Sequence, residues 1–460
     1  MKLSARRENT NMYYPHTEED RKAMLRTIGV EKISDLFLDV PAAYRFPELK
    51  LPPAVTEMEV LSELQEIAWM SDTTQDLICF LGAGAYHHYV PAAVDAILSR
   101  GEFYTAYTPY QPEISQGTLQ AIFEYQSLIA GLTGMEVCNA SHYDGATSVA
   151  EAVNMAYHHF REKRPKVVLS PALHPHYRET VRTYILGSDI RLVGDEPHTD
   201  LTAGPESLIP LIDEQTALVI VAYPDFFGRV YDYTALAEAA HTRGALLSVS
   251  INPIALGLLK PPGEFGADIV TGEGQPLGIP LSFGGPYLGL FATRQQYVRK
   301  MAGRLVGETV DDRGQRAYVL TLTAREQHIR RERATSNICT NQALMALAST
   351  VYLSLLGKQG LRRVAELCYH KAHFAAKKIA SISGYALWSQ VPFFNEFVIR
   401  CPTSASRVLE HLLEENILGG YDLSQNYPSL QQHLLIAVTE MNSRDEIETL
   451  AEALAEVPHD

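Results

Sequence analysis

The sequence predicts an α/β protein with two folded parts, a large domain built on a mostly parallel sheet and a smaller C-terminal α+β domain. Two observations predict this. Short apolar segments alternate with amphipathic ones between about residues 76 and 310, and long helical stretches followed by shorter strands begin at about residue 330. The chain has 460 residues, 46% of them hydrophobic, which is enough to bury a large core in two packed domains.

Three apolar segments predict strands that are buried on both faces of the sheet: residues 166–170, 218–222 and 246–249. Residues 233–243, between the last two, predict an amphipathic helix that ends at Gly244. This β-α-β order implies parallel strands flanked by helices. Ligands of such sheets bind beyond the carboxyl ends of the strands, so we expect a site there.

Residues 1–75 predict an N-terminal arm, because they are polar and contain several prolines. The helices predicted in this segment are short, and two of them are separated at Gly29. We expect this arm to lie over the body of the protein or over a partner. The large domain is expected over residues 76–330 and the small domain over residues 331–460. The small domain is predicted to contain helices over 341–356, 361–382, 405–416 and 443–455 and strands over 394–399 and 434–438.

Composition and charge exclude several classes of protein. The formal net charge is -15 and the arginine run at 325–333 is the one basic cluster, so we expect no nucleic-acid binding. The N-terminal segment lacks the apolar core of a signal peptide, and no apolar stretch has the roughly 18 residues of a membrane span, so we expect a cytoplasmic protein. The adjacent His87 and His88 diverge on an ordinary turn, so no metal site is expected. Neither a zinc site nor a disulfide framework is expected from the scattered Cys79, Cys138, Cys339, Cys368 and Cys401.

Residues 144–148 predict the start of a helix, with Asp144 or Thr147 as its cap. The free amide groups of its first turn, at Gly145, Ala146 and Thr147, form a cradle that suits a phosphate group. An ordinary capped helix without a ligand accounts for the same residues.

The loop at 106–117 contains Tyr107, Tyr110, Gln111 and Glu113 together with two prolines, Pro109 and Pro112. The prolines restrict the loop, which helps to hold polar groups in a fixed array. The loop therefore predicts a site or an interface, with a plain surface turn as the alternative.

Two further segments have alternative interpretations. The glycine-rich residues 272–289 let the backbone approach a ligand or partner closely, or form a tight structural hairpin. The arginines of 325–333 bind an anionic group, or lie on a solvated helix face and form salt bridges.

These segments resemble the P-protein of the glycine cleavage system. The resemblance rests on residues 107–134, 140–152, 282–294 and 323–346, and it extends from about residue 12 to about residue 455. The runs YTPYQPE and TSNICTNQ are long and unusual, so the match is specific. At this length the chain is similar to the N-terminal half of the single-chain form and to the alpha subunit, subunit 1, of the two-subunit bacterial form.

The resemblance implies the fold of fold-type I pyridoxal-phosphate enzymes. It implies a complex, a decarboxylating glycine dehydrogenase of glycine catabolism, that decarboxylates glycine, releases carbon dioxide and transfers the aminomethyl group to the lipoyl arm of the H-protein. It also implies that the lysine that holds pyridoxal phosphate belongs to the beta subunit, subunit 2. The chain itself is then expected to bind no cofactor and to be inactive alone.

The residues of this chain agree with a missing cofactor lysine. Within residues 168–298 the only lysine is Lys260, which precedes the strand predicted at 268–270. Gln275 and Pro276 follow that strand, at about the place where the catalytic subunit of the family has a histidine–lysine pair. Neither residue can form a Schiff base.

A second requirement of the cofactor is also unmet. The strand at 246–249 continues into Ser250, Ile251 and Asn252, and it offers no carboxylate to keep a pyridinium nitrogen protonated. We therefore expect the cradle at Gly145, Ala146 and Thr147 to be vestigial.

The resemblance also implies where this chain contributes to function. The two subunits of the family pack like a fold-type I homodimer, in which each subunit lends residues to the site of its neighbour. By that analogy, we expect Tyr107, Tyr110, Gln111 and Glu113 to approach the active site of the partner. Two other functions stay open, an autonomous pyridoxal-phosphate lyase that uses Lys260 and a scaffold that docks H-protein.

Overall fold

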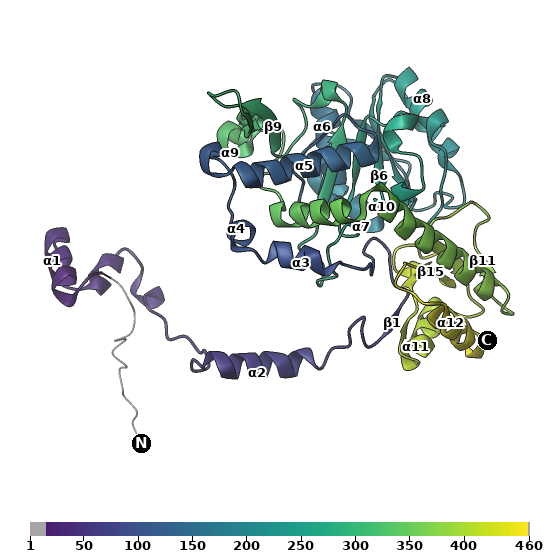
Figure 1. Cartoon of the computed structure of the whole chain (residues 1–460), viewed down its shortest axis with the longest axis horizontal. Helices are drawn as coiled ribbons and strands as arrows, with labels where there is room; N and C mark the ends of the chain where they lie inside the picture. The colour runs from purple at the N-terminus through teal and green to yellow at the C-terminus, as the bar shows by residue number, and fades with distance from the viewer. Residues whose placement is uncertain (1–14, 459–460) are drawn as a thin grey trace. The chain divides into compact units, whose positions relative to one another are not determined.

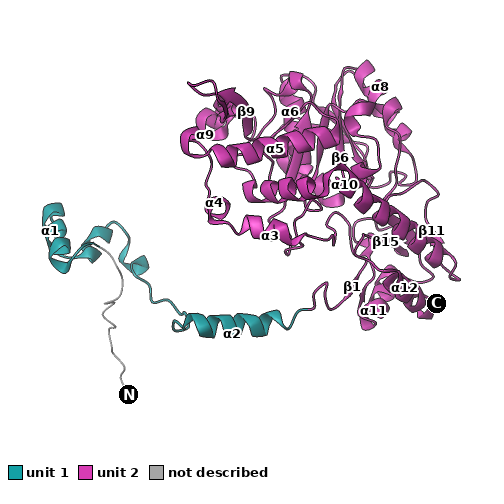
Figure 2. Ribbon diagram, viewed as in Figure 1, with its two compact units in different colours: residues 1–71 teal, residues 72–460 magenta. Residues whose placement is uncertain are grey.

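The computed structural model describes residues 15–458 and contains two compact units, residues 1–71 and residues 72–460 (Figure 2). The limits expected from the sequence for the arm and for the large and small domains stay predictions. None of the helices within the described residues combines the length and apolarity that a membrane crossing requires.

The first unit contains two amphipathic helices, α1 (Glu18–Ile28) and α2 (Glu57–Ala68). Each begins with a capping box, in which a threonine hydroxyl and an acidic side chain satisfy the free amides of the first turn. Helix α1 ends at Gly29 in the left-handed conformation (φ 90°), at the predicted break. No side chain of residues 15–71 is buried.

The second unit is built on a seven-stranded sheet (Figure 1). Strands β3 to β7 are mutually parallel, while β8 is antiparallel to both of its neighbours. The order across the sheet is β2 (Val137–Cys138), β8 (Gly289–Thr293), β7 (Ile269–Glu273), β6 (Leu246–Ile251), β5 (Thr216–Tyr223), β3 (Lys166–Leu169) and β4 (Arg191–Val193). The three strands and the intervening helix α8 (Thr234–Thr242) that the sequence predicts are confirmed.

Helices cover both faces of this sheet, which gives a three-layer α/β arrangement. On β5, Val219 and Val221 pack into one core with α5 (Gln116–Thr133), α8 and α10 (Ala343–Ala380). Leu218 and Ile220 point to the opposite face, into a core with α6 (Gly145–His159) and α7 (Pro175–Tyr184). All eight residues of β5 are buried, as an apolar strand between two helical layers requires.

Helix α10 bends at Gly357, which has φ 56° and ψ -173°. Only glycine adopts this region readily, because it has no Cβ. The two helices predicted over 341–356 and 361–382 are therefore confirmed as two segments that meet at this residue.

The C-terminal part contains a four-stranded antiparallel sheet with two helices, α11 (Ala405–Glu414) and α12 (Arg444–Glu456). Its strand order is β11 (Ala386–Leu387), β12 (Glu396–Arg400), β15 (His433–Ala437) and β14 (Tyr421–Asp422). Strands β11, β12 and β15 and the two helices share one buried core with the second segment of α10. The helices and strands predicted from residue 394 onward are confirmed.

Shorter elements complete the second unit. The hairpin of β9 and β10 packs against α5, and β1 pairs in parallel with β13. These elements are β1 (Ile78–Cys79), α3 (Ala92–Leu98), α4 (Gly101–Tyr104), β9 (Leu305–Val310), β10 (Arg316–Thr321), α9 (Gln327–Arg330) and β13 (Ile417–Leu418).

Candidate functional site

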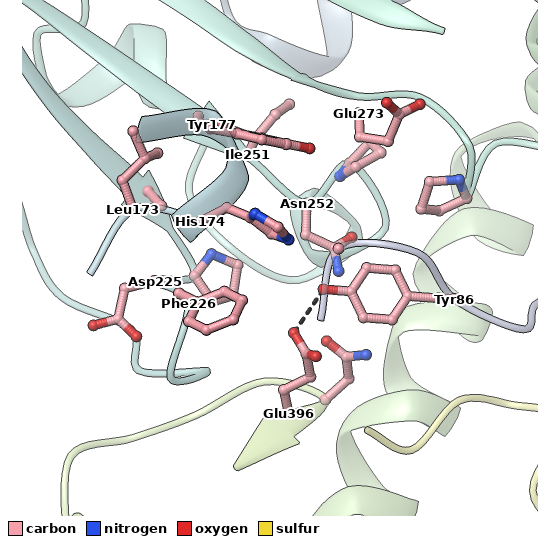
Figure 3. Close-up of a pocket in the computed structure, with 17 residues that line it drawn as sticks. Tyr86, Leu173, His174, Tyr177, Asp225, Phe226, Ile251, Asn252, Glu273 and Glu396 are labelled. Atoms are coloured by element: carbon pink, nitrogen blue, oxygen red, sulfur yellow. Dashed lines mark hydrogen bonds between the residues drawn. The ribbon is translucent and has the colours of Figure 1, made fainter. Parts of the chain in front are cut away.

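A cavity of about 60 Å³ lies beyond the carboxyl ends of β5, β6 and β7, where the sequence predicts a ligand site (Figure 3). This volume has room for a few water molecules. Its walls come from the loop after β1, the start of α7, the ends of the three strands and the start of β12.

Side chains of the chain itself fill much of this region. The Tyr86 hydroxyl donates a hydrogen bond to Glu396 Oε2 at 2.6 Å (Figure 3). The Ala83 amide donates to Glu396 Oε1 at 2.7 Å. The rings of His174 and Tyr177 stack with their centroids 4.7 Å apart. Burial raises the pKa of the Glu396 carboxyl to about 7.

The carboxylate of Glu273, the last residue of β7, lies at the N-terminus of α6. It accepts hydrogen bonds from the amide of Gly145 at 2.9 Å and from the amides of Gln275 and Leu288 at 3.0 Å each. An anion is stabilised at a helix N-terminus by the helix dipole and the free amides. Glu273 therefore takes the place that an anionic ligand would take, although burial raises its pKa to about 7.

The predicted cradle at Gly145, Ala146 and Thr147 forms the first turn of α6. Of the two caps that the sequence allows, Asp144 and Thr147, it is Asp144 that caps the helix, and its Oδ1 accepts from the Thr147 amide at 2.7 Å. Two amides of the cradle thus donate to carboxylates of this chain. That arrangement supports the interpretation of a vestigial cradle, which stays a prediction.

Gln275 and Pro276 lie directly after β7. The Gln275 side chain is buried, donates to the carbonyls of Tyr86 and Ile279 at 2.9 and 2.8 Å, and accepts from the Tyr86 amide at 2.9 Å. Pro276 lines the cavity. Gln275 is therefore a structural bridge between the loop after β1 and the end of β7.

No lysine of residues 15–458 lines the cavity, and Lys260 lies on the surface outside it. Ser250 and Asn252 line it at the end of β6, without a carboxylate from that strand. A third acid, Asp225, also lines the cavity, but its Oδ2 pairs with Arg229 Nε at 2.8 Å.

Pyridoxal phosphate does not fit these residues. An aldehyde needs an amine for a Schiff base, and the cavity offers none. A phosphate needs the amides at the start of α6, and Glu273 already accepts from the Gly145 amide. The residues that line the cavity therefore do not offer the groups that would hold this cofactor.

Sequence reasoning did not predict Tyr86, Glu273 and Glu396 as the centre of this region. Their partners are 128 to 313 residues away along the chain, so no local spacing reveals them. The available signal was chemical, since each glutamate lies within or at the end of an apolar strand, where a charged residue is unusual.

The predicted interface loop is exposed on the surface of the second unit. Tyr107 is 86% exposed, and Gln111 and Glu113 are also exposed. Two contacts hold the Tyr110 side chain against the second unit. Arg304 Nη2 lies 3.4 Å from its hydroxyl, and its ring contacts the ring of His328. The four side chains belong to one loop, and only Tyr110 is tied to the body by contacts of its side chain.

A second cavity, of about 290 Å³, lies behind this loop and is called the Arg304 pocket. It is lined by residues of the loop, of α5 and of the first turn of α10, together with Arg304. The two unusual runs of the sequence, YTPYQPE and TSNICTNQ, therefore contribute to one pocket. Sequence reasoning did not identify Arg304, which is a lone arginine directly before β9.

The arginines at 325–333 lie in two different environments. The Arg325 side chain is half-buried and donates to the carbonyls of Met301, Gly303 and Leu322. Arg330, Arg331 and Arg333 are exposed. An H-protein or subunit contact at this run stays a prediction.

Three possible metal-ligand side chains, His88, Cys368 and Glu440, have ligand atoms within 4.8 Å of one another. His88 Nδ1 lies 2.7 Å from Glu440 Oε2, and Cys368 Sγ donates to the same oxygen at 3.4 Å. The Tyr89 amide donates to the other oxygen at 2.8 Å. These separations are typical of a hydrogen-bond network. The expectation of no metal site stays a prediction.

Comparison with known proteins gives a consistent result. Residues 11–454 match the sequence family described as "Glycine cleavage system P-protein". A curated relative from Thermomicrobium roseum, named "Probable glycine dehydrogenase (decarboxylating) subunit 1", is 55% identical over 445 residues, which are 97% of this chain and 99% of the relative.

Solved structures agree with this match. The crystal structure of glycine decarboxylase (P-protein) of the glycine cleavage system, in inhibitor-bound form, is 43% identical with a TM-score of 0.87, over 97% of this chain and 100% of that chain. Lactobacillus brevis glutamate decarboxylase is 13% identical with a TM-score of 0.65, over 91% of this chain and 97% of that chain, which shows a common fold. The expected fold-type I architecture is confirmed.

Proposed function

The chain belongs to the glycine cleavage system P-protein family, and we propose that it is the subunit of a decarboxylating glycine dehydrogenase that carries no cofactor of its own. Its curated relative is named subunit 1 and matches it over nearly the full length of both chains. A protein named as one subunit implies a second, so the functional enzyme is a heteromer of subunits 1 and 2.

The observation that carries this proposal is the filled cavity beyond β5, β6 and β7. It has the position of the cofactor site in its fold, but it offers no lysine, and the carboxylate of Glu273 lies against the start of α6. Pyridoxal phosphate supplies an electron sink for decarboxylation when it is bound through a lysine. In this proposal, subunit 2 binds the cofactor.

The alternative of an autonomous lyase gains no support, because Lys260 is exposed and outside the cavity. We propose instead that this chain acts on the site of subunit 2 through the loop that contains Tyr107, Tyr110, Gln111 and Glu113. Exposed tyrosines on a proline-restricted loop are typical of protein interfaces. Glycine is the substrate and lipoylated H-protein the acceptor in this proposal, and the assembly works in the cytoplasm.

Reconstitution tests the proposal. Each subunit alone should be inactive in glycine decarboxylation with pyridoxal phosphate and lipoylated H-protein, while the mixture should be active. Glu113→Ala and Tyr107→Phe should each lower kcat of the mixture at least about tenfold, since tenfold corresponds to the loss of about 1.4 kcal/mol of transition-state stabilisation. Glu124→Gln, at an exposed position of α5, is the control and should leave kcat unchanged.

Assembly is measured in parallel by size-exclusion chromatography. Unchanged turnover of both loop variants in an intact heteromer would contradict a contribution of the loop to the partner site. Full activity of subunit 2 without this chain would contradict the proposal as a whole and would leave a docking role for the chain.

A further inference from the structure

Arg304 is buried in the wall of the Arg304 pocket, with 5% of its surface exposed, and its hydrogen-bond partners are all uncharged. Its Nη1 donates to Thr340 Oγ1 at 3.1 Å and to Asn341 Oδ1 at 2.9 Å. Its Nη2 donates to the Cys339 carbonyl at 2.8 Å and lies 3.4 Å from the Tyr110 hydroxyl. The guanidinium is thus fixed in place without a counter-ion.

Two facts make this arrangement unusual. No carboxylate of the described residues forms an ion pair with Arg304, whereas the other deeply buried arginine, Arg229, pairs with Asp225 at 2.8 Å. The Nε atom of Arg304 is also buried, and it has no hydrogen-bond partner within residues 15–458. A buried charge is costly unless it is paired, so a guanidinium in this state favours an anion beside it.

The N-terminus of α10 opens into the same pocket. Gln342, its N-cap residue, makes no side-chain hydrogen bond to the first turn, and Ala343 and Leu344 line the pocket. The helix dipole and the first-turn amides favour negative charge at this end. The hydroxyl-bearing Thr108 and Thr118 also line the pocket, and neutral donors of this kind complete an anion site.

We infer that the Arg304 pocket binds a phosphate or carboxylate group between Arg304 and the N-terminus of α10. The volume, about 290 Å³, is at the lower limit of typical small-molecule sites, roughly 300 Å³, and suits a small anion. Tyr107 lines this pocket and the Tyr110 hydroxyl lies beside Arg304, so the bound group orders the loop that we propose for the partner site.

The anion reaches the pocket from one of two sources. It is either free in solution or part of a molecule that subunit 2 holds. A binding experiment on the isolated chain tests this inference separately from the proposed role as subunit 1. Binding of a free anion to one chain requires neither turnover nor assembly with subunit 2.

Isothermal titration calorimetry of the isolated chain with inorganic phosphate, and separately with acetate, measures the site directly. At least one of the two should bind. Arg304→Met should weaken that binding at least about tenfold, which corresponds to about 1.4 kcal/mol, because it removes the charged hydrogen-bond donor of the site. Arg325→Met, which removes a half-buried arginine whose hydrogen-bond partners are also uncharged, should leave binding unchanged.

A second variant keeps Arg304 and its contacts to residues 339–341. Thr118→Glu, in the first turn of α5, adds a carboxylate to the pocket wall and should abolish anion binding without lowering the Tm. Thr118→Gln has the same size without the charge and should still bind. If neither phosphate nor acetate binds the wild-type chain, or if Arg304→Met and Thr118→Glu bind as the wild type does, the inference is overturned.

The same titration on the heteromer identifies the source. Continued binding of the free anion in the heteromer supports a solution anion. Loss of binding in the heteromer, with binding retained in the isolated chain, supports a group that subunit 2 inserts into the pocket.

Discussion

Glu273 and Glu396 show how single side chains fill the region beyond the carboxyl ends of β5, β6 and β7. Both are buried carboxyl groups whose pKa burial raises from 4.5 to about 7. Glu273 accepts three backbone amides and Glu396 accepts one amide and the Tyr86 hydroxyl. Glu273 therefore ties the end of β7 to the start of α6, and Glu396 ties β12 to the loop after β1. The protonation of both carboxyl groups is coupled to folding.

The stability of the protein should depend on pH through these groups. The folded state keeps a proton on Glu396 up to about pH 7, while the unfolded chain releases it near pH 4.5. The free energy of unfolding should therefore fall as the pH rises from 4.5 to 7. In Glu396→Gln this contribution is absent, so the free energy of unfolding should fall by roughly 2–3 kcal/mol less over that pH range. The figure comes from converting the pKa shift of Glu396 into free energy.

Urea unfolding at several pH values between 4.5 and 8 measures this effect. Glu264→Gln, at an exposed glutamate, is the matched control and should follow the wild-type curve. Parallel curves for the wild type and Glu396→Gln would show that Glu396 does not hold its proton in the folded state.

At the scale of elements, the bend of α10 separates the part that packs on the large sheet from the part that packs on the C-terminal sheet. Gly357→Ala should destabilise the protein by about 1–3 kcal/mol, because the residue adopts φ 56° and ψ -173°. A Cβ at this position meets no atom within 4 Å, so the cost is one of backbone conformation alone.

Gly131 provides the comparison, since it lies inside α5, is exposed, and also has no neighbour for an added Cβ. Gly131→Ala should stabilise the protein by about 0.5–1 kcal/mol. The two Tm shifts should thus have opposite signs. An unchanged Tm for Gly357→Ala would mean that the bend is not held as described.

The elements that the sequence predicts are those with strong local signals. The apolar runs of β3, β5 and β6 and the helical periodicity of α8 and α10 appear in single windows of residues. The hairpin of β9 and β10 was not predicted, because its exposed residues after Val306 weaken the apolar pattern. Strands of two residues, such as β2, carry no periodic signal at all.

The candidate site was predictable only in part for the same reason. Asp144 as a helix cap and the absence of a lysine after β7 are local properties, and both could be inferred from the residues. The contact of Glu273 with Gly145, and that of Arg304 with Thr340 and Asn341, depend on how distant segments pack. No spacing within the sequence encodes such pairs.

At the scale of the whole molecule, the second unit keeps a fold-type I architecture around a region filled by its own side chains. The exposed loop of Tyr107 to Glu113 and the Arg304 pocket lie elsewhere on that unit and are built from the most distinctive runs of the sequence. This combination supports a chain that completes the site of another subunit and performs no cofactor chemistry itself.

Covalent trapping of the cofactor tests this central claim most directly. The heteromer is reconstituted with pyridoxal phosphate, reduced with borohydride, and digested, and the modified lysine is identified by mass spectrometry. Modification should be found on a lysine of subunit 2 alone, with this chain unlabelled. Stoichiometric pyridoxyl-lysine on this chain, at Lys260 or at any other lysine, would contradict the account.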